Sequence, residues 1–284
     1  MRHLSGRAVT LKHSFLDDEE PLALTAVAVT VYPVLSGVDG LPVFSALAAA
    51  VDANGDWAVT LPTQPPKGEY RAEWIADAGV ATDETYFEVV GSFAFTVPEA
   101  RETDPELKDA TKFPAVEVRH YRDVAEAEFQ RITGRSATRR VGYFESSADG
   151  SREIMLPGFD AVQIISATVD DVDADVAGWR IVAGKIAQAP AALTEGAIIG
   201  IEYEYGFAPT PYDLRQAIIL RTRVLLFDEG KGVPDRATSF TPAGGGTFTL
   251  AQAGARGWET GVPDVDAVYK RYDLSTFLGV YGAI

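Results

Sequence analysis

The stretch GDWAVTLPTQPPKGEYRAEWIAD, residues 55–77, decides the fold of the first half of the chain. Apolar residues recur at every second position on both sides of a turn at Lys67-Gly68: Trp57, Val59 and Leu61, then Tyr70, Ala72, Trp74 and Ala76. An alternation with period two is typical of strands that bury one face. These residues therefore predict two strands whose apolar side chains face a core.

The same pattern extends on both sides of this stretch. Short apolar runs, separated by Gly, Pro and Asn, predict further strands at 7–11, 24–32, 85–90 and 93–97. Several short strands with such punctuation predict an antiparallel β-sandwich over residues 1–97. Residues 55–77 also resemble the middle of an immunoglobulin-like domain, a likeness of fold that carries no activity with it.

A charged stretch follows the predicted sandwich. Residues 98–112, PEARETDPELKDATK, are dense in charge and poor in apolar side chains. We interpret them as a linker, or as a short exposed helix, and expect the domain boundary inside them. A chain of 284 residues is long enough for two domains.

The second half mixes helices and strands. A helix is predicted from Pro114 to a stop at Gly134, a second over 211–228 and a short third over 263–271. Strands are expected between the first two helices, at 141–145, 152–156, 162–169, 179–182 and 198–205, with Ala148-Asp149-Gly150 joining the first two as a hairpin. A glycine-rich segment, 234–261, contains a further short strand near 247–250.

Composition excludes several classes of protein. There are 25 basic and 41 acidic side chains, so the net charge is −16 and the chain should repel DNA rather than bind it. It has no cysteine, which excludes disulfides and thiol catalysis. With neither a signal peptide nor a membrane span in the sequence, we expect a soluble protein made in the cytoplasm.

Residues that could carry chemistry are few. The three histidines have no partners at metal-ligand spacing, and no G-x-S-x-G elbow is present. The acidic runs 17–20 and 170–175 could bind calcium. The first lacks the spaced oxygen ligands and central glycine of a calcium loop, so a solvated loop is favoured; the second resembles such a loop more closely but lacks a bidentate Glu at the right distance, so metal binding is not favoured there either. Arg139-Arg140 is expected to pair with carboxylates, within the chain or across a subunit contact. Four aromatic residues of the second half could form a ligand platform: Trp179, Tyr203, Tyr205 and Trp258. Packing in a core or an interface is the favoured interpretation for them. We therefore expect no enzyme, no metal and no cofactor.

Two motifs in the second half point to a family. These are PDRATSF, residues 234–240, and GVPDVDAV, residues 261–268, within the order of elements described above. Over residues 113–274 the chain resembles the head-to-tail adaptor (connector) proteins of long-tailed bacteriophages. The resemblance implies an α+β adaptor domain, a small helical bundle with a β insertion, and no catalytic residues to carry over.

The resemblance also implies a function and partners. Such adaptors form a ring, usually of twelve copies, that docks on the portal protein of the capsid, extends the DNA channel and presents a surface to the next tail-completion (stopper) protein. The protein would then reside in the virion, at the head–tail junction, with DNA passing through without specific binding and with no membrane partner. The sandwich over 1–97 is an addition to this pattern, expected on the ring exterior or against a neighbouring copy or the capsid.

Candidate contact residues lie in the glycine-rich arm, 234–261, and in the apolar tail, 275–284, with the residue before it. An isolated loop cannot easily bury aromatic residues, and an apolar terminus is unfavourable in water. We therefore expect subunit or portal contacts from Arg236, Phe240, Phe248, Leu250, Trp258, Leu274, Phe277, Leu278 and Tyr281. The alternative function is a phage tail or surface protein that binds a receptor or carbohydrate through its immunoglobulin-like domain.

Overall fold

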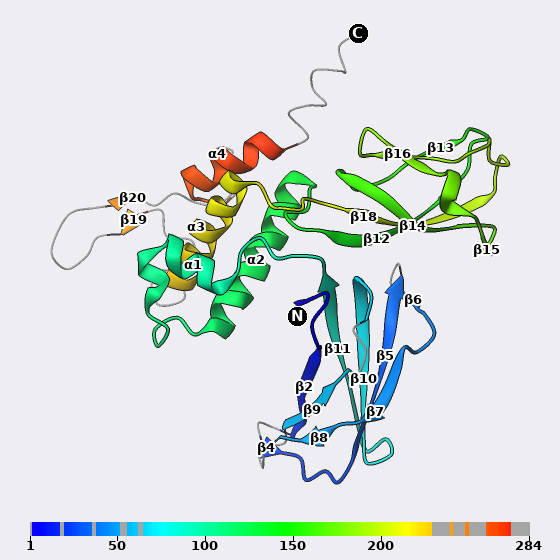
Figure 1. Cartoon of the computed structure of the whole chain (residues 1–284). Coiled ribbons are helices and arrows are strands. Elements are labelled where there is room, and N and C mark those ends of the chain that lie inside the picture. Colours follow the sequence, from blue (N-terminus) through cyan, green and yellow to red (C-terminus); the bar gives the residue numbers. More distant parts are fainter. Residues whose placement is uncertain are drawn as a thin grey trace. The chain divides into compact units, whose positions relative to one another are not determined.

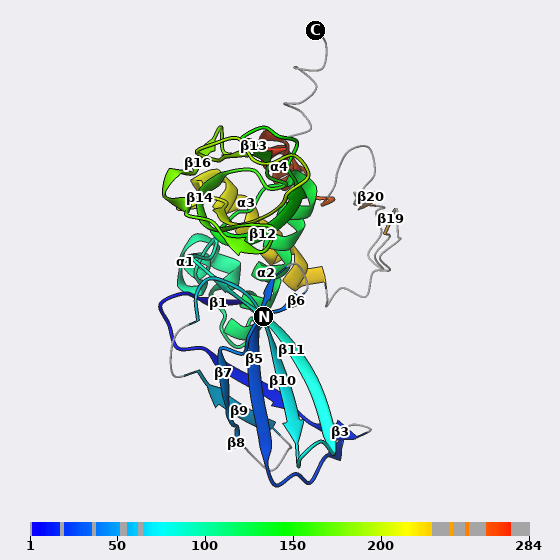
Figure 2. The same ribbon diagram turned by 90° about the vertical axis from the view of Figure 1, so that its right-hand side faces the viewer.

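The computed structural model describes residues 2–17, 20–35, 38–51, 56–61, 65–228, 239–240, 248–249 and 260–273. Most of the described structure is β-sheet, in several sheets, with a few helices (Figures 1 and 2). The chain divides into two units. The β unit comprises Met1–Ser92 and Arg139–Tyr205, and the helical unit comprises Phe93–Thr138 and Gly206–Ile284.

Two sheets make up the N-terminal part of the β unit. The first has the order β1-β11-β10-β5-β6, with β7 also paired to β5; the second has the order β2-β9-β8. β1 runs parallel to β11, whereas the other pairs are antiparallel. The strands are β1 Arg2–Leu4, β2 Thr10–Ser14, β5 Val27–Leu35, β6 Val38–Asp39, β7 Phe44–Leu47, β8 Ala49–Ala50, β9 Asp56–Thr60, β10 Gly68–Ala76 and β11 Ala81–Val90, and a small pair is formed by β3 Leu16–Asp17 and β4 Glu20–Pro21.

The residues with period two form the core of these sheets. Both predicted runs are buried, and Val27, Val29 and Val31 of β5 join them. Buried Trp74 keeps its polar atom satisfied, since Nε1 donates to Thr85 Oγ1 at 2.7 Å. The strands predicted around 57–61, 70–76, 24–32 and 85–90 are thus confirmed within four residues at each end, whereas of the predicted strand 7–11 only Thr10 and Leu11 belong to a strand, β2.

The segment after β11 differs from the prediction. Residues 93–97 are not a strand, because Ala94 and Phe95 are buried in the core of the helical unit. Within 98–112, the expected linker, the chain forms α1 (Val97–Thr103) and the 3-10 helix η1 (Pro105–Lys108). Two apolar residues of this charged stretch, Ala100 and Leu107, are fully buried, whereas Ala110 is exposed. The division between the units therefore falls after Ser92, ahead of the predicted boundary.

Local sequence explains why a helix begins there. Thr96 and Glu99 form a capping box: each side chain bonds to the backbone N–H of the other residue. Burial of one apolar residue in α1 and one in η1 holds the remaining charged side chains outward. A segment poor in apolar residues can thus pack when those few residues face a core.

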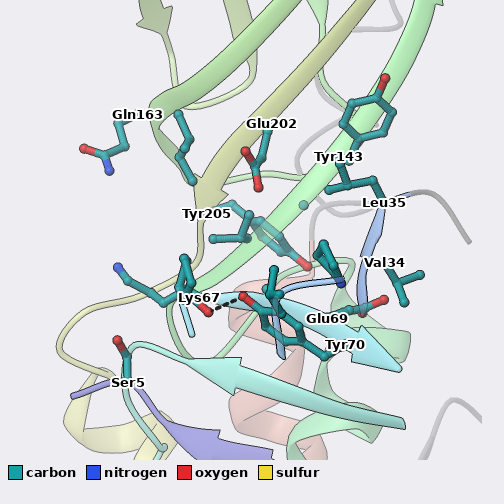
Figure 3. A pocket seen from close by; sticks show the side chains of 17 residues that line it. Ser5, Val34, Leu35, Lys67, Glu69, Tyr70, Tyr143, Gln163, Glu202 and Tyr205 are labelled. Carbon is teal, nitrogen blue, oxygen red and sulfur yellow. Dashed lines mark hydrogen bonds between the residues drawn. The ribbon is translucent and has the colours of Figure 1, made fainter. Parts of the chain in front are cut away.

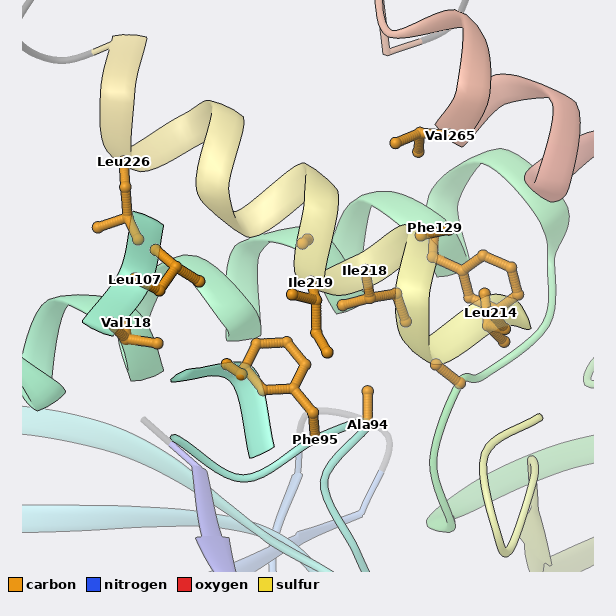
Figure 4. Packing of buried hydrophobic residues seen from close by; sticks show 14 of the residues in the cluster. Ala94, Phe95, Leu107, Val118, Phe129, Leu214, Ile218, Ile219, Leu226 and Val265 are labelled. Carbon is orange, nitrogen blue, oxygen red and sulfur yellow. The ribbon is translucent and has the colours of Figure 1, made fainter. Parts of the chain in front are cut away.

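Three longer helices complete the helical unit. They are α2 (Ala115–Thr133), α3 (Tyr212–Asp228) and α4 (Pro263–Tyr272), close to their predicted bounds. Gly134 ends α2 in the left-handed conformation, with φ 69°, as its sequence position predicts. The helices pack around one core (Figure 4), which includes Phe95, Leu107, Val118, Phe129, Leu214, Ile218 and Val265.

The β unit also contains residues 139–205, which form two small sheets, β12-β18-β14-β15 and β13-β17-β16. The predicted hairpin through 148–150 is wrong. β12 pairs with β18, and β13 pairs with β17, so β12 and β13 do not pair with each other. After β12, Ala148 N–H donates to the carbonyl of Ala197, and the carbonyl of Ala148 accepts from Gly196 N–H, which extends the pairing with β18 instead of closing a hairpin. The elements are β12 Arg140–Ser147, β13 Glu153–Met155, β14 Ala161–Val169, β15 Val172–Asp173, η2 Val176–Gly178, β16 Arg180–Val182, β17 Ile186–Gln188 and β18 Ile198–Tyr205.

The chain leaves the helical unit and returns to it at neighbouring points. Thr210 Oγ1 donates to the carbonyl of Ala137 at 2.7 Å, and Phe207 N–H donates to that of Ser136 at 3.3 Å. Gly206 has φ 94°, and a Cβ there would lie 2.1 Å from the carbonyl oxygen of Thr138. Residues 139–205 are therefore a β insertion between α2 and α3.

Candidate functional site

The contact residues expected from the sequence fall almost entirely outside the described residues. This holds for Arg236, Leu250, Trp258, Leu274, Phe277, Leu278 and Tyr281. The backbones of Phe240 and Phe248 are described: they pair in a two-stranded antiparallel sheet of β19 (Ser239–Phe240) and β20 (Phe248–Thr249). This sheet contains the short strand predicted near 247–250.

A pocket of about 800 Å³ lies within the β unit (Figure 3). Its walls come from β5, β10 and the segments next to them, and from β12, β14 and β18 of the insertion. Val34, Leu35 and Ile165 supply apolar surface, while Gln163 supplies an amide. A volume of roughly 300–1,000 Å³ is typical of sites that hold a small ligand or a peptide side chain.

Tyrosine hydroxyls and carboxylates contribute the other polar groups of this pocket. Tyr70 donates its hydroxyl to the carbonyl of Pro66 at 2.9 Å, and Ser166 donates to Glu202 at 3.0 Å. Burial, and then the charge of Glu202, raise the pKa of Tyr70 to about 12, so this hydroxyl stays protonated at neutral pH. Burial also raises the pKa of Tyr143, which donates to Glu145. Tyr70 and Tyr143 therefore offer neutral hydroxyl groups rather than phenolates.

Ion pairs hold the strands beside the pocket. Lys67 pairs with Glu204, whose carboxylate also lies 3.9 Å from Arg139 Nη1. Nearby, Glu88 on β11 is shared by Arg2 and Arg140, at 3.0 Å from Arg2 Nε. The expectation that Arg139-Arg140 pairs with carboxylates is confirmed, and the partners lie within the chain.

Sequence reasoning did not find this pocket. Lys67, Tyr70 and Glu202 are far apart along the chain, and each belongs to a segment that reads as ordinary strand or turn. Only the pairing of β12 with β18, and the ion pairs of Glu88 and Glu204, bring these groups together. The sequence signal that could have indicated this pocket is the presence of charged residues, such as Glu88 and Glu204, within otherwise apolar strands.

The acidic run 170–175 has structural roles in the described protein. Asp170 and Asp171, with φ 49° and 62°, form the two-residue turn between β14 and β15. The Asp170 carboxylate accepts a hydrogen bond from Ile198 N–H at 2.8 Å, and Asp175 caps η2. In the run 17–20, Asp18 and Glu19 lie outside the described residues. Across the described ranges, no cluster of three or more His, Asp or Glu residues could hold a metal ion.

The candidate aromatic platform packs inside the insertion. Tyr203 is buried there, and Trp179 and Tyr205 pack against the same core. Tyr203 also accepts a hydrogen bond from Gly158 N–H at 3.2 Å. Packing in a core is thus confirmed for these residues, and Trp258 lies outside the described part.

No protein-family model and no curated protein matches this chain. Among the helices of the described ranges, none combines the length and the apolar character needed to span a membrane.

Proposed function

We propose that this chain is a structural protein of the virion, a head-to-tail adaptor. In this role it assembles into a ring, docks on the portal protein, extends the DNA channel and offers a surface to the next tail-completion protein. The observation that supports this proposal is the connectivity of the helical unit, in which α2 and α3 are interrupted by the β insertion 139–205. A helical bundle with a β insertion is what the resemblance of residues 113–274 implies.

The path of the chain, where it leaves the helical unit before residue 139 and returns after residue 205, supports an insertion within a helical unit. Contacts between 136–138 and 206–210 bring together the two points at which the chain leaves the helical unit and returns to it. The helical core also recruits Ala94, Phe95 and Leu107 from the segment that precedes α2. We therefore assign the adaptor part to residues 93–273, and the added immunoglobulin-like domain to the sheets formed before residue 92.

The charge of the chain suits a DNA channel. With 41 acidic against 25 basic side chains, a ring of such chains would on balance repel phosphates. Many of the described arginines are already engaged: Arg140 with Glu88, Arg221 with Glu128 and Arg71 with Asp39. DNA could therefore slide past without being held.

The alternative, a receptor- or carbohydrate-binding protein, would use clusters of aromatic side chains on the loops of the sandwich. The two tryptophans of the sandwich, Trp57 and Trp74, are buried in its core, and the exposed Tyr86 lies within strand β11 rather than on a loop. The proposed adaptor therefore remains the better-supported function.

The test is assembly with a portal ring. Purified chain is mixed with purified portal protein, and the complex is examined by negative-stain electron microscopy and native mass spectrometry, with the chain alone as the control. We expect a second ring on the portal, of about twelve copies as the resemblance implies. A chain that stays unassembled beside intact portal rings would overturn the proposal, and a chain that instead binds glycans or cell surfaces would support the alternative.

A further inference from the structure

A run of the sandwich with several exposed apolar residues carries no charge. Residues 40–51 read GLPVFSALAAAV, between Asp39 and Asp52. Charged side chains make up 23% of the chain, and the net charge is −16. Two copies of so acidic a chain repel each other over most of their surface. An uncharged run is where they can approach.

This run borders both sheets of the sandwich. β7 pairs with β5 at the margin of the first sheet, and β8 pairs with β9 at the margin of the second. Among the described residues neither strand has a second partner. β7 and β8 follow each other along the chain and lie close together in Figures 1 and 2. The edge strands of the two sheets are thus adjacent and uncharged.

Side chains of the run alternate between the core and solvent. Phe44, Ala46 and Ala48 pack against the core of the sandwich. The odd-numbered residues face outward: Leu41 is 87% exposed, Leu47 72% and Val43 52%. Exposure of three large apolar residues on one edge is costly in water and marks an interaction surface.

Natural edge strands are kept from pairing by a charged residue, a proline, a bulge or a very short length. β7 is short, at four residues, but no charged residue protects it. Here Pro42 precedes β7, and β7 itself, Phe44–Leu47, has neither proline nor charge. Because Ala48 N–H bonds to Val27 of β5, and alternate residues of a strand face opposite sides, the backbone groups of Ser45 and Leu47 face the open side.

We propose that β7 pairs with the β7 edge of a second copy of this chain, in antiparallel orientation about a two-fold axis. Self-pairing is favoured because the edge is apolar and uncharged, so each copy offers the other a surface that it can approach without charge repulsion. The contact would bury Leu41, Val43 and Leu47 of both copies. It does not depend on the proposed ring, whose neighbours meet head to tail.

The test is a charge placed on the edge. Leu47→Asp sets two carboxylates near the two-fold axis, where like charges oppose each other. Val80→Asp is the matched control, since Val80 is an apolar residue of the same unit, 79% exposed, in the turn before β11. Sedimentation velocity and native mass are measured over a range of concentrations for the natural chain and both variants. Circular dichroism checks that each variant is folded.

We expect Leu47→Asp to halve the mass of the species that the natural chain forms, whether a dimer or a double ring, and Val80→Asp to leave it unchanged. We also expect association of the natural chain to strengthen with added salt, which screens the acidic repulsion. If Leu47→Asp fails to fold, Ser45→Asp takes its place, because Ser45 is exposed and already polar. A natural chain that shows no two-fold species, or one that the edge variants leave intact, would overturn the proposal. Failure of portal docking alone would not.

Discussion

Gly206 makes the sharpest test of how the insertion joins the helical unit, through the substitution Gly206→Ala. Two costs follow from the structure. The backbone φ of 94° is a conformation that residues with a Cβ rarely adopt, which costs about 1–3 kcal/mol. The new Cβ would also lie 2.1 Å from the carbonyl oxygen of Thr138 and 3.0 Å from Ser136 Cβ, so that backbone must shift. Overpacking of this kind costs about 1–3 kcal/mol. The expected loss of unfolding free energy is therefore about 2–6 kcal/mol.

Gly134→Ala is the matched control. Gly134 also has a positive φ, 69°, but a Cβ there would meet nothing within 4 Å. Its cost is conformational only, about 1 kcal/mol. Urea unfolding, followed by far-ultraviolet circular dichroism, measures both variants against the natural chain. Equal, small losses of unfolding free energy for the two variants would refute the close contact between residues 138 and 206. They would also refute the description of how the chain leaves the helical unit and returns to it.

Two further predictions concern buried charge and pH. Glu126, which is buried, accepts a hydrogen bond from Ala94 N–H at 2.8 Å, and its Oε1 lies 3.9 Å from Arg122 Nε. Glu126→Ala removes the acceptor of that buried N–H, whereas Arg122 keeps its ion pair with Asp123 at 3.0 Å, so the variant should cost about 1–3 kcal/mol in urea unfolding. The exposed variant Glu117→Ala on the same helix should cost little, and equal effects would contradict this role. Burial lowers the pKa of His13 below its ordinary value of 6.5, an effect that the charge of Asp83 only partly offsets. Below pH 6.5 the His13 imidazole therefore binds a proton in the unfolded chain but stays neutral in the folded chain. The free energy of unfolding falls as the pH drops from 6.5 toward the lower pKa of His13 in the folded chain. His13→Gln should flatten this part of a plot of urea midpoint against pH, and an unchanged slope would show that other groups cause it.

The proposed edge contact and the proposed adaptor ring lead to separate assemblies. The edge lies on β7 of the sandwich, whereas the adaptor proposal rests on the helical unit and its insertion. A ring subunit with a self-pairing domain could link two rings or two virion components. Measuring mass with and without Leu47→Asp, in the presence of portal, separates these contributions.

Local structure in this protein follows from sequence wherever period and punctuation agree. The alternation in 55–61 and 70–76 places Trp57 and Trp74 in a core, and the apolar stripe from Val118 to Phe129 with its stop at Gly134 defines α2. In such segments the side chains that must leave water recur with the period of the element itself. In these segments the sequence by itself therefore determined the type of element and its buried face.

Pairing between distant segments was decided only by tertiary structure. Residues 93–97 have the composition of a strand but bury Ala94 and Phe95 against helices, and the turn residues at 148–150 face Gly196 and Ala197 instead of closing a hairpin. The pocket depends likewise on Lys67 meeting Glu204, across more than a hundred residues of chain. A local pattern specifies which side chains need burial, but not which surface buries them. That choice depends on the packing of the whole chain, where backbone hydrogen bonds and buried ion pairs must all be satisfied together.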